Sequence, residues 1–534
     1  MPNRLRWLAW SAPFLFAAYP ILFLYAHNIA DLSLRSLALP LAVALGLTAA
    51  LFLTLGFVIS NDQKAGLITT LFVILFFSCG HAYEGLISSP FGRSWLWLFI
   101  NIKTALLAVW SVIFLAGTVA ILRTKRDLGT IKRLLVITGA VLVGTTLASI
   151  GSYEIFRDRS LPVNNQGGSK EEAAESGSVK TPNIYYIVVD AYAGKDALKR
   201  FYGFDNSEFL DYLERKGFYV ANRSRSNYPR TSLSLASSLN MAYLKDLMPA
   251  VDTDSRDIGA SRRLIRHNEV FRSLRRRGYT IVAVSSGCAD TELDNADVYF
   301  KPGWTLDEFQ NAVIGTTPIP LLLDVTGSPD QFDAHRNRIL FEFDQISRLS
   351  SMKAPFVAFA HIEIPHPPFV FGADGQRLNP GTIFHDRDGN WLIRDGRLTR
   401  SEYVRQYVDQ LTYTNHKLKM LIDSILSGAG TPPILILQSD HGPRSMLSWE
   451  DPEKTDFREC MSIVNAYYLP GGAEALYEDI SPVNTFRIIF NRYFGTEYTM
   501  LEDRNYFSTA RYPYRFIDVT GSMTERHSTT SSGR

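Results

Sequence analysis

Cysteine is scarce in this chain, with three residues among 534. Cys79, Cys288 and Cys460 are too few for a disulfide framework and lack the close spacing of a cysteine metal site. Cys79 lies within an apolar run, whereas Cys288 and Cys460 could pair only if the second half of the chain lies outside the cytoplasm. The scarcity excludes a small scaffold held together by disulfides.

A large excess of charge of one sign is also lacking. The 55 Lys and Arg residues nearly balance the 53 Asp and Glu residues, which gives a formal net charge of +2. This balance gives no sign of a nucleic-acid-binding protein. The hydrophobic residues, 46% of the chain, are by contrast unevenly spread, because nearly all long apolar runs lie before residue 152. The chain is too long for one ordinary domain, and this spread predicts a membrane domain followed by a globular one.

Five apolar runs occupy the first 152 residues, and each is long enough, at about 18 residues or more, to cross a bilayer as a helix. They lie at 8–26, 36–60, 66–83, 96–122 and 134–152. The first is not typical of a cleaved signal peptide, since four more spans follow it. Lys103, in the fourth run, either contacts a lipid headgroup or extends its ammonium group to the interface.

Basic residues set the predicted orientation of these spans. They precede the first run and crowd the connection between the fourth and fifth, as Arg123, Lys125, Arg126, Lys132 and Arg133. Because short loops rich in Lys and Arg stay in the cytoplasm, we expect the N-terminus inside and everything after the fifth span outside. The sequence therefore predicts a multi-pass protein of the inner (plasma) membrane with an extracytoplasmic, periplasmic globular domain.

The second half of the chain alternates short apolar segments with helical patterns. Strands are predicted at Ile184–Val189, Thr280–Ser286, Pro355–Ile364, Pro433–Gln438 and Asn465–Leu469, and helices at Ser207–Lys216, Asn268–Arg277 and Arg400–Leu426. This alternation predicts an α/β fold, a mostly parallel sheet flanked by helices. The expected layout is a five-span domain at 1–156, a flexible polar linker at 157–182, the globular domain at 183–520 and a disordered tail at 521–534.

Polar residues stand at the ends of three predicted strands. Asp190 ends the first, His366 follows the third, and the pair Asp440-His441 follows the fourth. Ligands of parallel α/β sheets bind beyond the carboxyl ends of the strands, so we expect these side chains in one site. Residues 365–398, rich in Pro and Gly, form a candidate lid or substrate loop over it.

A hydroxyl in the segment Asn227–Asn240 completes this site. Thr231 stands at a loop-to-helix junction, where the positive end of the helix dipole favours phosphate oxygens. Because an unassisted threonine is a weak nucleophile, it needs a base or a metal. Together with Asp190, Asp440 and His441 it makes a plausible site for one Zn²⁺ or Mn²⁺, which would activate the hydroxyl and polarise a phosphoryl oxygen. The alternative is that Thr231 only caps a helix.

Three motifs resemble the alkaline phosphatase superfamily in its sulfatase-like branch. They are Asn-Ile-Tyr-Tyr-Ile-Val-Val-Asp190, Pro-Arg-Thr231-Ser-Leu-Ser and Gln-Ser-Asp440-His441-Gly. Membrane spans before such a domain resemble the lipoteichoic acid synthases and lipid A phosphoethanolamine transferases. The resemblance implies that Thr231 is nucleophile and metal ligand, that Asp190, Asp440 and His441 complete the metal site, and that His366 contacts substrate. Where Asp190 stands, those families often have Glu.

The resemblance also implies the activity. We expect a membrane-bound transferase that moves phosphoethanolamine or phosphoglycerol from a phospholipid donor to a glycan or lipid acceptor of the cell envelope through a threonine-linked intermediate. A membrane-anchored phosphatase or phosphodiesterase and a non-catalytic binding protein are the alternatives. Sulfatase chemistry is disfavoured, because no cysteine lies near Thr231 and Pro229-Arg230 precede it instead of following it. A second metal, with candidates His361, Glu363 and His366, stays open.

Overall fold

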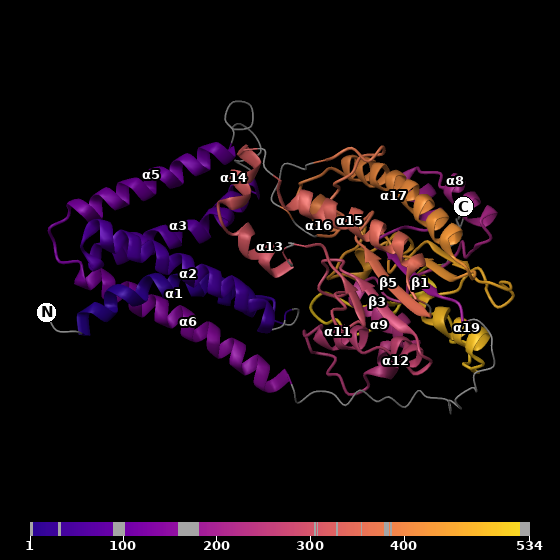
Figure 1. The fold of residues 1–534 in the computed structure, drawn as a ribbon. Coiled ribbons are helices and arrows are strands. Elements are labelled where there is room, and N and C mark those ends of the chain that lie inside the picture. The colour runs from indigo at the N-terminus through magenta and orange to yellow at the C-terminus, as the bar shows by residue number, and fades with distance from the viewer. Residues whose placement is uncertain are drawn as a thin grey trace, which may run out of the picture. The chain divides into compact units, whose positions relative to one another are not determined.

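The computed structural model describes residues 4–29, 32, 34–88, 102–157, 181–303, 306, 308–326, 329–353, 355–378, 384 and 387–523. The chain forms two compact units (Figure 1). The first, here called the helical unit, comprises Met1–Ser160, Trp304–Ala334 and Gly381–Phe384. The second, the α/β unit, comprises Leu161–Gly303, His335–Pro380 and His385–Arg534.

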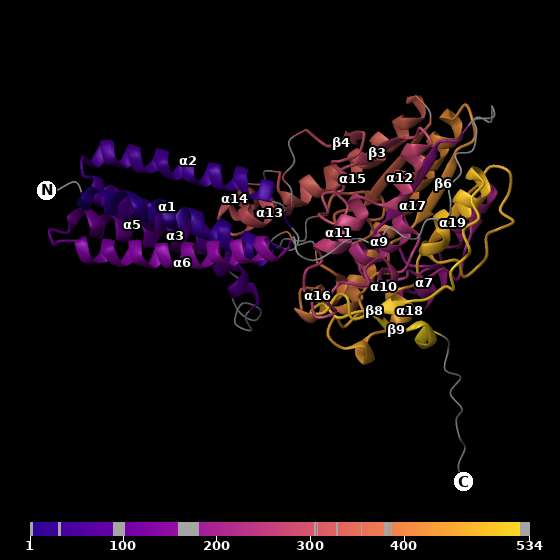
Figure 2. The same ribbon diagram turned by 90° about the horizontal axis from the view of Figure 1, so that it is seen from below.

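Long helices running side by side make up most of the helical unit (Figure 2). They are α1 (Arg4–His27), α2 (Leu34–Ile59), α3 (Asp62–Ser88), α5 (Ile102–Arg123) and α6 (Gly129–Arg157). Among the described residues, four helices are long and apolar enough to cross a membrane: Ser36–Ile59, Asp62–Ile87, Ile102–Arg123 and Gly129–Ile155. Four of the predicted spans thus correspond to apolar helices. The first predicted span corresponds to α1, which is not among these four, and the count of five stays a prediction.

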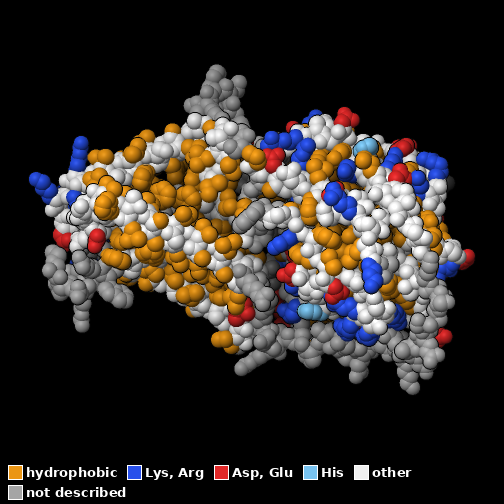
Figure 3. All heavy atoms as spheres, viewed as in Figure 1, with side chains coloured by type: hydrophobic (Ala, Val, Ile, Leu, Met, Phe, Trp, Pro, Cys, Tyr) orange, Lys and Arg blue, Asp and Glu red, His pale blue; other side chains and the backbone are white. Residues whose placement is uncertain are grey.

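The helical unit exposes apolar side chains to an extent that water would not favour. Phe57 is 87% exposed and Val58 is 71% exposed. Figure 3 shows hydrophobic side chains over most of the visible face of this unit. Soluble proteins rarely expose contiguous apolar patches of such size, so this surface fits a lipid environment.

Two short helices encoded far from the N-terminus also belong to the helical unit. They are α13 (Glu308–Gly315) and α14 (Ile319–Thr326). In sequence they fall between two strands of the α/β unit, and α15 (Gln331–Arg348) leads from them back into that unit. The sequence did not predict that α13 and α14 belong to the helical unit, because apolar helices of eight residues are too short to be recognised as membrane spans.

The α/β unit is built on a seven-stranded sheet with the order β2-β7-β6-β1-β5-β3-β4. The strands are β1 (Ile184–Val189), β2 (Tyr219–Val220), β3 (Thr280–Val284), β4 (Val298–Phe300), β5 (Phe356–Ile362), β6 (Ile434–Gln438) and β7 (Asn465–Tyr468). The central strand β1 pairs in parallel with β5 and β6, and β3 pairs in parallel with β5 and β4. Among the described strands of this sheet, the antiparallel pairs are β6–β7 and β2–β7. The predicted mostly parallel α/β sheet is therefore confirmed.

Helices cover both faces of this sheet. Every residue of β1, β5 and β6 is buried, as expected of parallel strands covered on both sides. A core cluster joins Tyr186 of β1 to apolar side chains of α9, α11, α12 and α19, while α15 and α17 lie across the sheet in Figure 1. The helices are α7 (Lys195–Tyr202), α8 (Ser207–Arg215), α9 (Thr231–Asn240), α10 (Leu244–Leu247), α11 (Gly259–Arg266), α12 (Glu269–Arg276), α16 (Gly389–Arg394), α17 (Arg400–Gly428), α18 (Phe457–Cys460) and α19 (Pro482–Phe494).

Capping residues mark the starts of two predicted helices. Asn268 accepts a hydrogen bond from the Phe271 amide at the start of α12. Thr399 and Glu402 form a reciprocal capping box at the start of α17. A small hairpin of β8 (Tyr506–Phe507) and β9 (Ile517–Asp518) closes the unit.

Some sequence predictions fall outside the described residues. Most of the linker at 157–182 and of the tail at 521–534 belongs to this group. The three cysteines are described and all are free thiols, so the possible bond between Cys288 and Cys460 does not form.

Candidate catalytic and metal site

Neighbouring parallel strands bring the predicted acidic ligands together. Asp190 follows β1, and Asp440 and His441 follow β6, its hydrogen-bonded neighbour. The Nε2 atom of His441 lies 3.3 Å from Asp190 Oδ1 and 3.1 Å from Asp440 Oδ2. All three side chains are buried. The structure thus brings together three of the residues that the sequence placed at strand ends.

A tight turn after β6 allows Asp440 and the adjacent His441 to face one point. A Cβ atom on Gly442 would lie 2.1 Å from the Glu459 carbonyl oxygen, so only glycine fits here without movement. His441 Nδ1 lies 2.8 Å from the Gly442 carbonyl oxygen and donates to it. This bond leaves the Nε2 lone pair directed at the carboxylates.

Thr231 is the first residue of α9, and its side chain joins this cluster. Its Oγ1 lies 3.1 Å from His441 Nε2. The N-cap position belongs to Arg230, so the alternative that Thr231 merely caps a helix is wrong. Ser234 on the next turn donates to the Asp440 carbonyl oxygen at 2.7 Å, which fixes the start of α9 against the end of β6.

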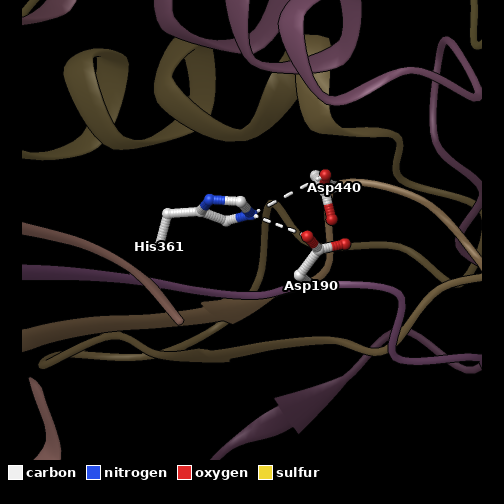
Figure 4. Close-up of side chains that lie close together, drawn as sticks. All are labelled: Asp190, His361 and Asp440. Atoms are coloured by element: carbon white, nitrogen blue, oxygen red, sulfur yellow. Dashed lines mark ion pairs between the residues drawn. The ribbon is translucent and has the colours of Figure 1, made fainter. Parts of the chain in front are cut away.

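His361 is a further member that the sequence did not assign to this group. It lies on β5, the other neighbour of β1, and its Nε2 is 3.6 Å from Asp190 Oδ2 and 3.8 Å from Asp440 Oδ2 (Figure 4). Donor atoms of these three residues all lie within 4.8 Å of one another. The Nδ1 atom of His361 is 3.0 Å from Thr291 Oγ1, which orients the ring. From the sequence, His361 was a candidate only for a second metal ion. The feature that could have placed it here is its position near the end of a predicted strand.

The spacing and charge of these donors fit a divalent metal ion. Separations between the facing donor atoms range from 3.1 to 3.8 Å. Ligands about 2.0–2.2 Å from a tetrahedral Zn²⁺ are roughly 3.3–3.6 Å apart. Burial, with help from the nearby Arg444 charge, lowers the pKa of His441 to about 3, so its imidazole is neutral and able to ligate at neutral pH. Burial alone would raise the pKa of Asp440, but the imidazoles of His441 and His361 and a Thr231 hydrogen bond lower it overall.

A second group of polar side chains, which includes His366, lies beside the candidate metal ligands. The rings of His366 and His441 have centroids 6.4 Å apart. His366 Nε2 lies 3.4 Å from Asp388 Oδ1 and accepts from Arg444 Nη2 at 3.3 Å. Trp449 donates its indole N–H to Asp388 Oδ2 at 2.9 Å. Burial opposes ionisation of Asp388, but the charge of Arg444 beside it holds the pKa of this carboxyl well below its usual range.

Arg444 is buried. It pairs with Asp388 at 2.6 Å and donates to the Pro229 carbonyl oxygen, two residues before Thr231, at 3.2 Å. Its φ of 57° lies in the left-handed region, which is uncommon for arginine. The backbone is thus held so that this guanidinium reaches the start of the Thr231 loop.

A cavity of about 1730 Å³ lies next to this group. Its walls include Arg200, Arg400, Ser445 and Trp449. Among the described residues that line it, none is a candidate metal ligand. Trp449 links the two, because its ring packs against the guanidinium of Arg230, 4.8 Å from the ring centroid. The cavity is large enough for a substrate group, and the Arg230 that packs on its Trp449 wall is the residue before Thr231.

The fold and the site define an α/β enzyme with a buried cluster of carboxylate, imidazole and hydroxyl groups. The Sulfatase family model matches residues 182–486, more than half of the chain. The chain belongs to the Sulfatase family and is an enzyme of the alkaline phosphatase superfamily, as its motifs predicted.

Several solved structures are similar to this chain at low identity. The C-terminal periplasmic domain of EcEptC from Escherichia coli, in complex with Zn, is 12% identical over 64% of this chain and 94% of its own, with a TM-score of 0.41. Lipooligosaccharide phosphoethanolamine transferase A (EptA) from Neisseria meningitidis, an integral membrane protein, is 11% identical over 90% and 95%, with a TM-score of 0.38. BT1596, a 2-O GAG sulfatase, is 14% identical over 60% and 72%, with a TM-score of 0.38. No curated protein matches the sequence.

Proposed function

We propose that this protein is a metal-dependent transferase that moves phosphoethanolamine or phosphoglycerol from a membrane phospholipid to an acceptor of the cell envelope. The observation that carries the proposal is the position of Thr231. Its hydroxyl lies at the positive end of a helix and 3.1 Å from His441, within the cluster formed by Asp190 and Asp440. A helix start favours phosphate oxygens, and the apolar helices of the helical unit suit a lipid donor.

Asp190, Thr231, Asp440 and His441 would hold one Zn²⁺ or Mn²⁺, with His361 as an additional donor. Such an ion lowers the pKa of a bound hydroxyl and polarises a phosphoryl oxygen. Two anionic carboxylates and neutral imidazoles are the ligand types that these borderline cations accept.

The reaction would proceed in two displacements at phosphorus. First, Thr231 Oγ1 forms a bond to phosphorus, the bond to the diacylglycerol oxygen breaks, and diacylglycerol leaves with the proton that the threonine loses. An acceptor hydroxyl then forms the new bond to phosphorus, and Thr231 leaves and regains a proton. His366 donates its Nδ1 proton to the Pro367 carbonyl oxygen, and its Nε2 accepts from Arg444 Nη2. Nε2 would therefore receive the acceptor's proton after the incoming hydroxyl displaces the Arg444 hydrogen bond. Arg444 lies where its charge would stabilise the phosphoryl oxygens.

A phosphatase or phosphodiesterase would use the same residues, with water in place of the acceptor. Both reactions release diacylglycerol, so the fate of the headgroup distinguishes them. A transferase leaves it on Thr231 until an acceptor arrives, whereas a hydrolase releases it into water. A binding protein without catalytic activity would form no adduct.

The proposed location is the inner (plasma) membrane, with five spans within 1–156, a linker at 157–182, the catalytic domain at 183–520 on the periplasmic side and a tail at 521–534. The support is the crowding of Lys and Arg between the last two spans.

The test of the mechanism is Thr231→Ala in the full-length protein, with Ser232→Ala as the matched control. Ser232 is a buried hydroxyl in the same helical turn. Thr231→Ala should fold, since a lost hydrogen bond costs only about 1 kcal/mol, but it should release no diacylglycerol from labelled phospholipid. Mass spectrometry of the parent should find the headgroup on Thr231. Turnover by Thr231→Ala near that of Ser232→Ala would overturn the proposal.

A further inference from the structure

The helices α13 and α14 form a hairpin that packs against the apolar helices of the helical unit. The ring of Phe309 on α13 meets the ring of Tyr25 edge-on, with centroids 6.0 Å apart. The Gly80 amide donates to the Thr316 carbonyl oxygen at 2.9 Å. A Cβ atom on Gly80 would lie 2.0 Å from a carbonyl oxygen of the hairpin, so the approach requires glycine. Leu321 on α14 is buried against Cys79, Tyr83 and Leu106.

An ion pair fixes α14 to the start of α5. Lys103 Nζ lies 2.6 Å from Asp324 Oδ2, and the two side chains are 14% and 30% exposed. Lys103 is the second residue of α5, so the pair lies at the end of this helix opposite to Arg123. The sequence had suggested a headgroup contact or a lysine reaching the interface, and the structure gives Lys103 a carboxylate partner.

The other face of α14 is apolar and exposed. Ile319, Leu322 and Val325 are 36%, 48% and 46% exposed, and their spacing of three residues places them along one side of the helix. Helix α14 packs against α5, whose own exposed residues include Val109, Val112 and Leu115. The hairpin therefore packs on a candidate membrane span that exposes apolar side chains, as the strip itself does.

The depth of the hairpin follows from its contact with α3. The apolar part of α3 spans 26 residues, Asp62–Ile87, or about 39 Å at 1.5 Å per residue, which exceeds a hydrocarbon core of roughly 30 Å. Gly80 lies about 27 Å along this helix from Asp62 by the same rise. If Asp62 marks the cytoplasmic edge of the core, the hairpin contacts α3 near its outer edge.

We propose that the α13–α14 hairpin is embedded in the outer leaflet, where Ile319, Leu322 and Val325 contact phospholipid acyl chains. The occupant of this face is the bilayer, because the hairpin packs on α3 and α5, two candidate membrane spans, and its exposed strip is apolar as the surface of α5 is. The hairpin would then be a second attachment to the membrane, since the chain enters the helical unit after Gly303 and leaves it after Ala334. This assignment does not depend on the catalytic mechanism.

The test uses the full-length protein with Leu322→Cys, labelled with an environment-sensitive fluorophore and reconstituted in phosphatidylcholine vesicles. The control is Met420→Cys on α17, whose side chain is 54% exposed in the α/β unit. The unsubstituted protein gives the background from Cys288, which is partly exposed, because Cys79 and Cys460 are buried.

Label at position 322 should emit in the blue and lose at least half of its intensity when the vesicles contain phospholipids brominated on their acyl chains. Label at position 420 should emit as in water and be unaffected. Water-like emission at 322 would overturn the proposal, and so would blue emission without quenching, which would mean that protein covers the strip. Val325→Cys repeats the measurement if Leu322→Cys does not fold.

Discussion

His361 is a candidate metal ligand beyond the set expected from the sequence. Its Nε2 faces Asp190 and Asp440 from a third strand, and Thr291 holds its Nδ1. If it is a ligand, His361→Ala should weaken metal binding by roughly 100-fold, since changes even in groups that only support ligands cost 10–100-fold. Competition with a coloured chelator measures the dissociation constant, and the d–d absorption of the Co²⁺ form reports the loss of a nitrogen donor.

The control for this variant is His416→Ala, an exposed histidine on α17. It should bind metal as the parent does. Without metal, His361→Ala and the parent should unfold at similar temperatures if the effect is on ligation. An unchanged dissociation constant and an unchanged Co²⁺ spectrum would remove His361 from the ligand set.

Glu342 on α15 is predicted to make the stability of the protein depend on pH. It is fully buried, and neither of its carboxyl oxygens has a hydrogen-bond partner among the described residues. Burial raises the pKa of Glu342 well above 4.5; the charge of Arg338 opposes this rise and the charge of Glu292 adds to it. The folded protein therefore keeps a proton that the unfolded chain releases. The contribution of Glu342 to the free energy of unfolding is fully present below about pH 4.5 and declines as the pH rises toward the folded-state pKa.

Replacing Glu342 with glutamine should remove this decline, because the amide stays neutral and has nearly the same shape. Glu342→Gln should match the parent near pH 4 and be more stable at pH 8, by about 1.4 kcal/mol for each unit by which the pKa is raised, up to pH 8. Urea unfolding in detergent at both pH values measures this. Glu214→Gln, at an exposed site on α8, should change neither value. Equal pH dependence in Glu342→Gln and the parent would contradict the assignment.

At the scale of elements, the turn after β6 positions two metal ligands. Gly442 packs so closely against the Glu459 carbonyl oxygen that a methyl group cannot fit without movement of backbone. Gly442→Ala should therefore displace Asp440 and His441 and lower metal content severalfold, in addition to lowering the unfolding temperature. Elemental analysis and thermal unfolding measure the two effects.

Gly430→Ala provides the matched control, because a Cβ atom there would meet no atom within 4 Å. It lies between α17 and β6, at the other end of the same strand. This variant should keep full metal content and nearly the parent's unfolding temperature. A Gly442→Ala protein with normal metal content would show that the turn can adjust without moving the ligands.

The strand ends explain which site residues could be predicted. Asp190, Asp440 and His441 end apolar runs that read as buried parallel strands, and their convergence follows from the parallel sheet alone. His361 could not be assigned in the same way, because it lies within β5 opposite Val188, and only the strand order shows which strand is next to β1. Asp388 lies in a segment with no regular pattern, where contacts depend on the path of the loop.

At the scale of the whole molecule, charge is segregated between the two ends of the helical unit. Lys64, in the first turn of α3, donates to the Leu122 carbonyl oxygen at 2.6 Å. Lys132, at the start of α6, donates to Gln63 at 2.5 Å. The α2–α3 and α5–α6 connections thus lie together, and both carry the basic residues that favour the cytoplasm, while the Lys103–Asp324 pair lies at the other end of α5.

This segregation predicts opposite locations for two points in the chain. A fluorescent protein inserted after Arg126 should fluoresce, because it remains in the cytoplasm, and β-lactamase joined after residue 160 should protect whole bacteria from ampicillin. Exchanging the two reporters should abolish both signals.

A fluorescent protein at the N-terminus decides the number of spans. Fluorescence there places the N-terminus inside, and together with an external residue 160 it requires an odd number, so α1 would cross as the fifth span. A dark N-terminal fusion with an external residue 160 would leave four spans, and protection by β-lactamase inserted after Arg126 would contradict the orientation itself.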